Sequence, residues 1–261
     1  MSDNPSPVPS VELPIRYIES SMMTVAYAAA TARLQALTPA GMRVVEVLPG
    51  RAPVAIICFD YTETSIGPYG EVGIGWPVVD SARRQPPLLP LLFERRWPKM
   101  GWWVHHLPVT TEIALRGGRS IWGYPKFLAD IGFEWDGPRR ICTLAADGSE
   151  ILRVALDTRL PARPDRFPLK TYSVLDDQLL CTTIDVDAVG IRRNARVSAE
   201  LTLGSHPVGR ELAELDLNLG RPVEVRWFPS WRALLPEAQE RRPIAGAASA
   251  DPDAADRAKV A

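Results

Sequence analysis

The segment from Ala114 to Ile131, ALRGGRSIWGYPKFLADI, contains the residue types best suited to covalent chemistry, because it places one amine, Lys126, among apolar neighbours. Residues 121–125 on one side, and Phe127 and Leu128 on the other, are mostly large and apolar. A free lysine amine has a pKa of about 10.4, and desolvation lowers that value because it penalises the ammonium form. A neutral amine attacks a ketone to form a Schiff base. These neighbours make Lys126 a candidate nucleophile.

Lysine is rare in this chain. Of 30 basic residues, only Lys99, Lys126, Lys170 and Lys259 are lysines. A coding bias toward arginine accounts for the rarity, but it leaves these four as candidates for positions where arginine would not serve. Lys99 and Lys170 also have proline and aromatic neighbours. What distinguishes Lys126 from them is therefore the spacing of the residues around it.

That spacing resembles a known motif. Gly118, Arg119, four further residues, Tyr124, Pro125 and Lys126 are similar to the Gly-Arg-x-x-x-x-Tyr-Pro-Lys sequence of the acetoacetate decarboxylase family. The resemblance implies that Lys126 is the Schiff-base lysine. Family decarboxylases usually carry a second lysine directly after the nucleophile, whereas this chain has Phe127, so desolvation alone must activate the amine.

A second element of the resemblance is the turn GPYG at residues 67–70, which precedes Glu71 and an apolar stretch. The resemblance implies that Glu71 is the acid/base carboxylate, with Tyr69 close to the substrate. Loss of water from a carbinolamine and protonation of an enamine both require a proton donor. A partly buried glutamate can hold a proton near neutral pH.

The remaining substrate-binding candidates surround the lysine. Tyr124, Trp122 and Phe127 are expected to wall the pocket. Arg119 is either a clamp for a substrate carboxylate, through its bidentate fork, or a structural partner of Glu112.

The resemblance implies a carbon-carbon lyase that acts on a small oxo acid without a cofactor, as a homo-oligomer, and the first hypothesis is decarboxylation of a 3-oxo acid. An arginine and a carboxylate of the family's site fall at Ser20 and Ile56 in this sequence. Two alternatives therefore stay open. One is an aldolase-dehydratase or cyclase that uses the same lysine on a 2-oxo acid such as pyruvate. The other is a non-catalytic small-molecule-binding protein on the same fold.

The charge and the histidines exclude other classes. A net charge of −1, with acids and bases mixed along the chain, provides no basic face for nucleic acid. His105, His106 and His206 lack a recognised ligand spacing, and adjacent residues on a strand point to opposite faces. We therefore expect no metal and no nucleic-acid partner.

The pattern of elements predicts an α+β fold dominated by antiparallel strands. The alanine-rich residues 23–37 are expected to form a helix, as are residues 207–215 and, more briefly, 231–239. About ten short apolar runs, including residues 111–115, are expected to be strands. Because they do not alternate regularly with helices, they favour an antiparallel or mixed barrel-like sheet. The resemblance implies that this sheet is a closed, cone-like barrel with a few flanking helices.

Composition sets the expected boundaries and location. We expect a disordered N-terminus at residues 1–14, a single domain at 15–236, and a disordered Ala/Asp-rich tail at 237–261. Three separate cysteines in apolar runs are expected to be reduced core thiols, which favours the cytoplasm. The sequence has neither a signal-type apolar region nor a run long enough to span a membrane.

Overall fold

The computed structural model describes residues 11–81, 85–88, 90, 97–159, 163–191 and 199–244. The helices within these residues are α1 (Thr31–Ala36), α3 (Glu112–Trp122) and α4 (Pro207–Glu214). The strands are β1 (Ile15–Ala30), β2 (Arg43–Val44), β3 (Arg51–Thr64), β4 (Tyr69–Val79), β5 (Met100–His106), β6 (Asp130–Asp136), β7 (Arg139–Ala146), β8 (Ser149–Asp157), β9 (Arg163–Leu175), β10 (Gln178–Ile191), β11 (Ala199–Leu203), β12 (Glu224–Leu235) and β13 (Glu240–Pro243).

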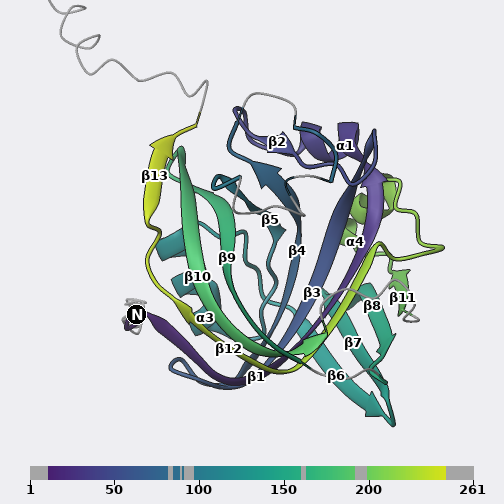
Figure 1. The fold of residues 1–261 in the computed structure, drawn as a ribbon. Helices are drawn as coiled ribbons and strands as arrows, with labels where there is room; N and C mark the ends of the chain where they lie inside the picture. The colour runs from purple at the N-terminus through teal and green to yellow at the C-terminus, as the bar shows by residue number, and fades with distance from the viewer. Residues whose placement is uncertain are drawn as a thin grey trace, which may run out of the picture.

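Seven of the strands form a closed barrel. The order β12-β1-β3-β4-β5-β9-β10 returns to its start because β10 also pairs with β12. All of these pairs are antiparallel except β5 with β9. Figure 1 shows the long strands β1, β3, β10 and β12 curving around the barrel, with α3 against one side. The predicted α+β class with a closed, mainly antiparallel barrel is confirmed.

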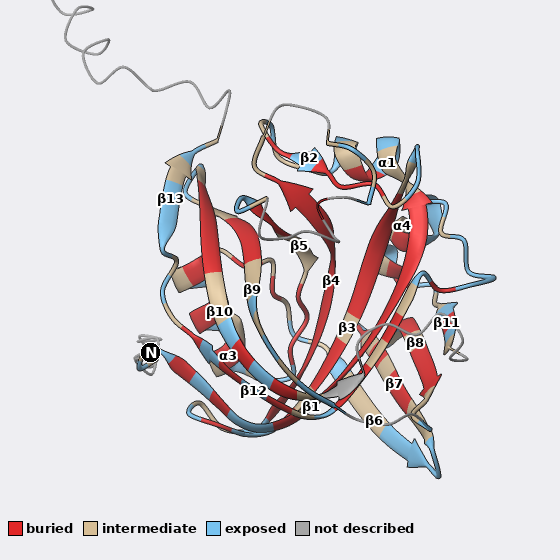
Figure 2. Ribbon diagram, in the orientation of Figure 1, coloured by how far each residue is buried: buried red, intermediate tan, exposed pale blue. Residues whose placement is uncertain are grey.

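A second, four-stranded sheet in the order β11-β8-β7-β6 packs beside the barrel. The larger buried cluster joins the two sheets, and in Figure 2 the buried residues lie along the strands that face one another. Helix α4 lies against β8 and β11. Burial of this shared apolar surface fixes the second sheet and α4 relative to the barrel.

The predicted helix at residues 23–37 is wrong over most of its length. Residues 15–30 form β1, and only Thr31–Ala36 are helical. Residues 22–29 are buried or nearly so on both faces of β1, which pairs with β3 and β12 on its two sides. Small residues such as alanine suit a strand that is enclosed on both faces, so packing overrides their helical propensity.

Two shorter predictions also fail. Residues 111–115 begin helix α3 and are not a strand. Residues 231–239, predicted as a helix, instead continue β12 to Leu235, because that segment pairs with both β1 and β10. The helix predicted at 207–215 is present as α4.

The folded region extends beyond the predicted limits of 15 and 236. Val11 and Leu13 pack against the core, and β13 pairs with the edge of β10. The rest of the predicted ends, residues 1–10 and 245–261, lies outside the described residues.

Two sequence predictions can be compared directly with the structure. Cys58, Cys142 and Cys181 are buried and free of disulfides, as expected. Within the part of the chain that the structure describes, no helix has the length and apolarity needed to cross a membrane.

Candidate active site

The end of helix α3 aims the segment that carries Lys126. Gly123 follows the helix with a φ of +62°, and its N–H donates to the carbonyl of Arg119 at 3.1 Å. A β-carbon at Gly123 would overlap the backbone carbonyl of Val174 on β9. Only glycine tolerates both the left-handed φ and this close contact with the backbone of β9. The chain can therefore leave the helix and continue directly beside β9.

The Lys126 side chain then runs back along the helix that precedes it. Gly118 faces the methylene chain of Lys126 so closely that a β-carbon there would overlap its Cδ and Cε atoms. Lys126 is only 5% exposed in consequence. Helix α3 therefore removes the amine from bulk water, as the sequence predicted from its apolar neighbours.

A short bridging segment brings Glu71 to the lysine. Val109 is fully buried, and its N–H donates to the Phe127 carbonyl at 2.9 Å, while its own carbonyl accepts from Ala129 at 3.0 Å. Val109 also bridges to Glu71 on β4, which lies on its other side. This arrangement places β4 next to the Lys126 segment, although 55 positions separate the two residues in the chain.

Lys126 and Glu71 form a buried pair. The Nζ atom of Lys126 donates to Oε2 of Glu71, and the two side chains are only 6% and 7% exposed. The hydroxyl of Tyr61 donates to the other carboxylate oxygen at 3.4 Å. Transfer of one proton from Nζ to Oε2 converts an ion pair into a neutral amine beside a neutral acid. That transfer leaves the net charge of the buried pair at zero, so burial does not oppose it.

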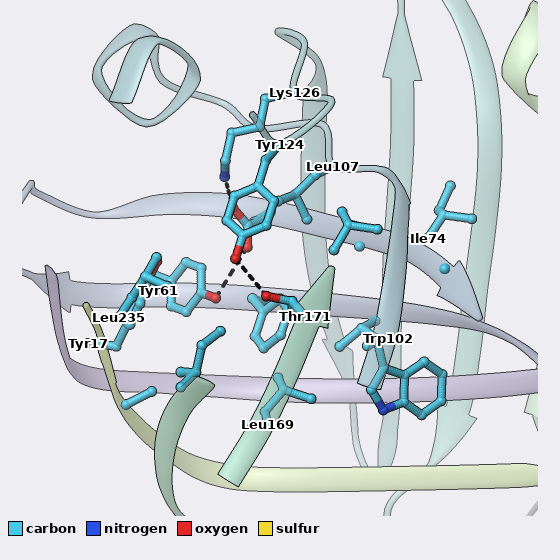
Figure 3. Close-up of a pocket in the computed structure, with 18 of the residues that line it drawn as sticks. Tyr17, Tyr61, Ile74, Trp102, Leu107, Tyr124, Lys126, Leu169, Thr171 and Leu235 are labelled. Atoms are coloured by element: carbon cyan, nitrogen blue, oxygen red, sulfur yellow. Dashed lines mark hydrogen bonds and ion pairs between the residues drawn. The ribbon is translucent and has the colours of Figure 1, made fainter. Parts of the chain in front are cut away.

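The pair faces a cavity of about 100 Å³ inside the barrel. All seven barrel strands contribute to its wall, and Figure 3 shows the Lys126 amine pointing inward above Tyr61, Tyr17 and Thr171. Most other lining side chains are apolar, among them Ile57, Phe59, Trp102, Leu169 and Trp231. Among the described residues that line the cavity, Lys126 is the only cation and Glu71 the only acid.

Tyrosine hydroxyls supply the other polar groups at the site. Burial raises the pKa of Tyr124 to about 12, and its hydroxyl lies 2.8 Å from Oγ1 of Thr171. Burial, followed by the nearby charge of Glu71, also raises the pKa values of Tyr17 and Tyr61. These three side chains line the cavity and stay protonated near neutral pH, so they are hydrogen-bond donors there.

Two of the predicted substrate-binding residues lie behind the cavity. Trp122 is buried, stacks on the ring of Tyr124 at a centroid distance of 6.0 Å, and donates from its indole to the Pro236 carbonyl. Tyr69 is buried too, and its hydroxyl lies 3.2 Å from that of Tyr17. Both support residues that line the main cavity, and both line a smaller one of about 10 Å³ beside Lys126.

The structure does not bring the other predicted contacts into the cavity. Arg119 is exposed, and its Nε donates to the backbone carbonyl of Lys126 at 2.7 Å. Glu112 pairs with Arg116 at 2.9 Å, so the suggested pair with Arg119 is absent from the described contacts. Phe127 packs edge-on against His106 on the other side of its segment. Arg119 therefore supports the lysine segment from outside.

The positions aligned with the family's other polar groups also lie outside the cavity wall. The hydroxyl of Ser20 donates to the Trp231 carbonyl at 2.6 Å. Ile56 is in the core on the opposite face of β3 from Ile57. Neither position supplies a charge to the cavity.

Several residues that line the cavity have no counterpart among the sequence predictions. Ile57, Phe59 and Tyr61 all face the cavity from β3, and their spacing of two is the signal that was available. Tyr17, Thr171 and Trp231 come from strands that reach the site only through closure of the barrel. No local pattern in the sequence identifies those three.

Comparison with known proteins defines the class. The model of the family described as acetoacetate decarboxylase (ADC) matches residues 3–230. The chain therefore belongs to the acetoacetate decarboxylase family. No curated protein matches it.

Solved structures of related fold cover nearly the whole chain. Acetoacetate decarboxylase from Legionella pneumophila subsp. pneumophila str. Philadelphia 1 is 19% identical over 90% of this chain and 93% of its own, with a TM-score of 0.60. An acetoacetate decarboxylase-like enzyme from Sphingomonas wittichii RW1 is 16% identical over 90% and 95%, with a TM-score of 0.60. The enduracididine biosynthesis enzyme MppR, complexed with pyruvate, is 13% identical over 93% and 94%, with a TM-score of 0.60. At these identities the likeness is one of fold.

Proposed function

We propose that this protein is a Schiff-base-forming lyase that decarboxylates a small 3-oxo acid. The observation that carries the proposal is the buried pair of Lys126 and Glu71 at the wall of an apolar cavity. An amine that attacks a carbonyl carbon must be neutral, and a proton acceptor in hydrogen-bond contact with the amine supplies that condition.

The proposed reaction uses these two residues throughout. The neutral amine of Lys126 adds to the ketone carbon, and Glu71 gives a proton to the departing hydroxyl, so that water leaves and an iminium forms. The bond to the carboxylate carbon then breaks, its electron pair moves into the iminium to form an enamine, and carbon dioxide departs. Glu71, which lost its proton when water departed, takes up another proton from water and delivers it to the enamine carbon. Water then hydrolyses the new iminium, which releases the ketone and restores the amine.

The apolar cavity supports decarboxylation in particular. An apolar cavity solvates the substrate carboxylate poorly, and loss of carbon dioxide disperses its negative charge. Tyrosine hydroxyls are the hydrogen-bond donors that the cavity wall offers to that carboxylate. The cavity volume of about 100 Å³ restricts the substrate to a small molecule.

An aldolase-dehydratase that uses pyruvate is the second candidate. The structure of MppR with pyruvate has the same fold, and a second MppR structure contains the condensation product of pyruvate and imidazole 4-carboxaldehyde. The same amine and acid would serve that reaction. The enamine carbon would then attack an aldehyde, whereas in decarboxylation it accepts a proton.

Product analysis separates these functions. We would incubate the purified protein with acetoacetate, and separately with pyruvate plus an aromatic aldehyde. Carbon dioxide and acetone from acetoacetate support the lyase, whereas a coupled and dehydrated product supports the second candidate. Lys126→Met removes either activity, while Lys99→Met, which changes a lysine with a 66% exposed side chain, leaves it intact. No product in either reaction, without a trapped adduct, contradicts both and favours a binding protein.

A further inference from the structure

A pair of adjacent histidines at the end of β5 turns toward the same side of the strand. Ile74 lies opposite His106 and Gly75 lies opposite Val104, so His105 is an extra residue in a β-bulge. The prediction that these histidines point to opposite faces is wrong, because a bulge interrupts the alternation of side chains along a strand.

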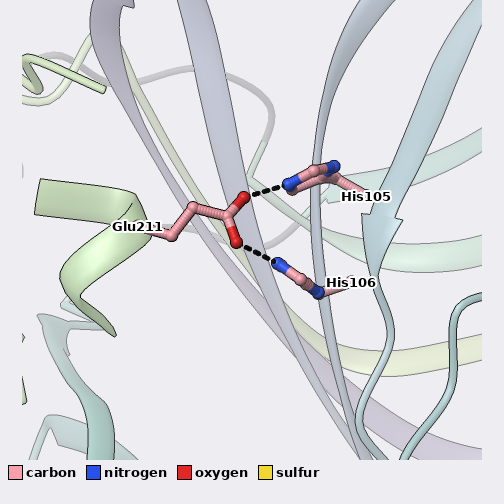
Figure 4. Close-up of side chains that lie close together, drawn as sticks. All are labelled: His105, His106 and Glu211. Carbon is pink, nitrogen blue, oxygen red and sulfur yellow. Dashed lines mark hydrogen bonds and ion pairs between the residues drawn. The ribbon is translucent and has the colours of Figure 1, made fainter. Parts of the chain in front are cut away.

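Both histidines converge on one carboxylate. Nε2 of His105 contacts Oε1 of Glu211, and Nε2 of His106 lies 3.1 Å from Oε2 (Figure 4). Donor atoms of all three residues lie within 4.8 Å of one another. Two strand residues and one helix residue thus present two imidazole nitrogens and a carboxylate to a common point.

Packing holds each of these side chains in place. The ring of His105 lies against Trp76 at a centroid distance of 4.6 Å, and the ring of His106 meets Phe127 edge-on at 6.3 Å. Helix α4, which carries Glu211, is fixed by Gly209, where a β-carbon would lie only 2.6 Å from two backbone carbonyl oxygens. The three donors are therefore preorganised and do not gather by chance on a mobile surface.

We propose that His105, His106 and Glu211 form a binding site for a divalent cation of the zinc class. Two neutral imidazoles and one carboxylate are a known protein donor set for zinc, which takes three protein ligands and keeps a further position for water. The set carries one negative charge, which suits a dication.

The site is separate from the Schiff-base cavity. On β5 that cavity is lined by Trp102, Trp103 and Val104, and none of the three proposed ligands lines it. The side chains of His105 and His106 are 14% and 19% exposed, and that of Glu211 is 34% exposed. A cation can therefore enter from the side of α4. It would link α4 to a barrel strand.

Metal titration of the full chain tests the proposal. Protein freed of metal by a chelator is titrated with zinc chloride in a calorimeter, and with cobalt chloride while visible absorption is recorded. We expect one zinc per chain, and cobalt bands typical of a four-coordinate nitrogen and oxygen site. Saturation at 100 times Kd is expected to raise Tm by about 5–10 °C.

Matched variants identify the ligands. Glu211→Gln and His106→Gln are expected to weaken zinc binding at least tenfold, whereas Glu214→Gln, the same change at an exposed position of α4, binds as the unchanged protein does. Thermal unfolding of the metal-free variants checks folding, and His105→Asn replaces His106→Gln if the latter does not fold. The proposal is overturned if the unchanged protein binds no zinc, or if Glu211→Gln binds it equally well. The histidines and Glu211 would then be a hydrogen-bonded cluster only.

Discussion

The α-carbon of Gly118 lies against the methylene chain of Lys126, so that the helix preceding the lysine forms one wall of its side-chain channel. Any side chain at position 118 would clash with the Lys126 side chain in its observed position. The glycine in the sequence motif thus has a packing reason, which is separate from its freedom of backbone conformation.

Gly118→Ala tests this relationship. In a helix interior alanine is more stable than glycine by about 1 kcal/mol, so a substitution without a clash would stabilise the protein. Here the added methyl overlaps Cδ and Cε, and we expect a net loss of about 1–3 kcal/mol in the free energy of unfolding, with a large loss of activity. Denaturant unfolding and the rate of product formation measure these effects. Gly117→Ala is the control, because its β-carbon would meet only the Val11 side chain.

A double-mutant cycle tests the pairing of Glu71 with Lys126. Glu71→Gln removes the proton acceptor and leaves the amine buried without an opposite charge, so we expect a loss of about 3–5 kcal/mol in stability and about 10²–10⁴-fold in rate. Adding Lys126→Met to that variant should restore part of the stability, since no charge remains unpaired. Lys126→Met alone completes the cycle, and a loss in the double variant equal to the sum of the two single losses would mean that the two residues are not coupled in the folded protein.

Sequence motifs correctly identified Lys126 and Glu71, two residues that meet in the folded chain. Each motif spans fewer than ten consecutive residues, so it can be recognised without knowledge of the fold. The barrel could be predicted from the number and irregular spacing of strands. The strand β1 could not be predicted, because its alanine-rich residues favour a helix by intrinsic propensity. Packing on both faces of the segment overrides that propensity. The convergence of His105 and His106 depends on a bulge, and a bulge has no signature in this sequence.

Arg119 was predicted either to clamp the substrate carboxylate or to pair with Glu112, and its hydrogen bond to the Lys126 carbonyl suggests a third role. If Arg119 positions the lysine segment, Arg119→Ala lowers kcat and leaves KM nearly unchanged. A carboxylate clamp would instead raise KM. Steady-state kinetics distinguish the two, with Arg116→Ala as the control, since Arg116 pairs only with Glu112 in the described structure.

Because all six tyrosines are buried, we expect them to ionise cooperatively as the protein unfolds at alkaline pH. Burial raises the pKa of each one in the folded protein, so the folded state holds the phenolic protons more tightly than the unfolded state does. Their stabilising contribution is full below about pH 10 and is lost as the pH rises above it. For Tyr124, with a pKa of about 12, the loss is about 3 kcal/mol.

Absorbance at the tyrosinate band, followed together with circular dichroism during an alkaline titration, measures this effect. We expect the two signals to change together, well above pH 10. Tyrosinate that forms near pH 10 while the circular dichroism stays native would mean that these hydroxyls are open to water.

Reductive trapping tests the central claim most directly. The protein is mixed with acetoacetate or pyruvate, reduced with borohydride, digested and analysed by mass spectrometry. We predict a stable adduct on the peptide that contains Lys126, absent from Lys126→Met, and none on the peptides that contain Lys99 or Lys170. An unmodified Lys126 with every oxo acid tried, or an adduct spread equally over the lysines, would contradict the account.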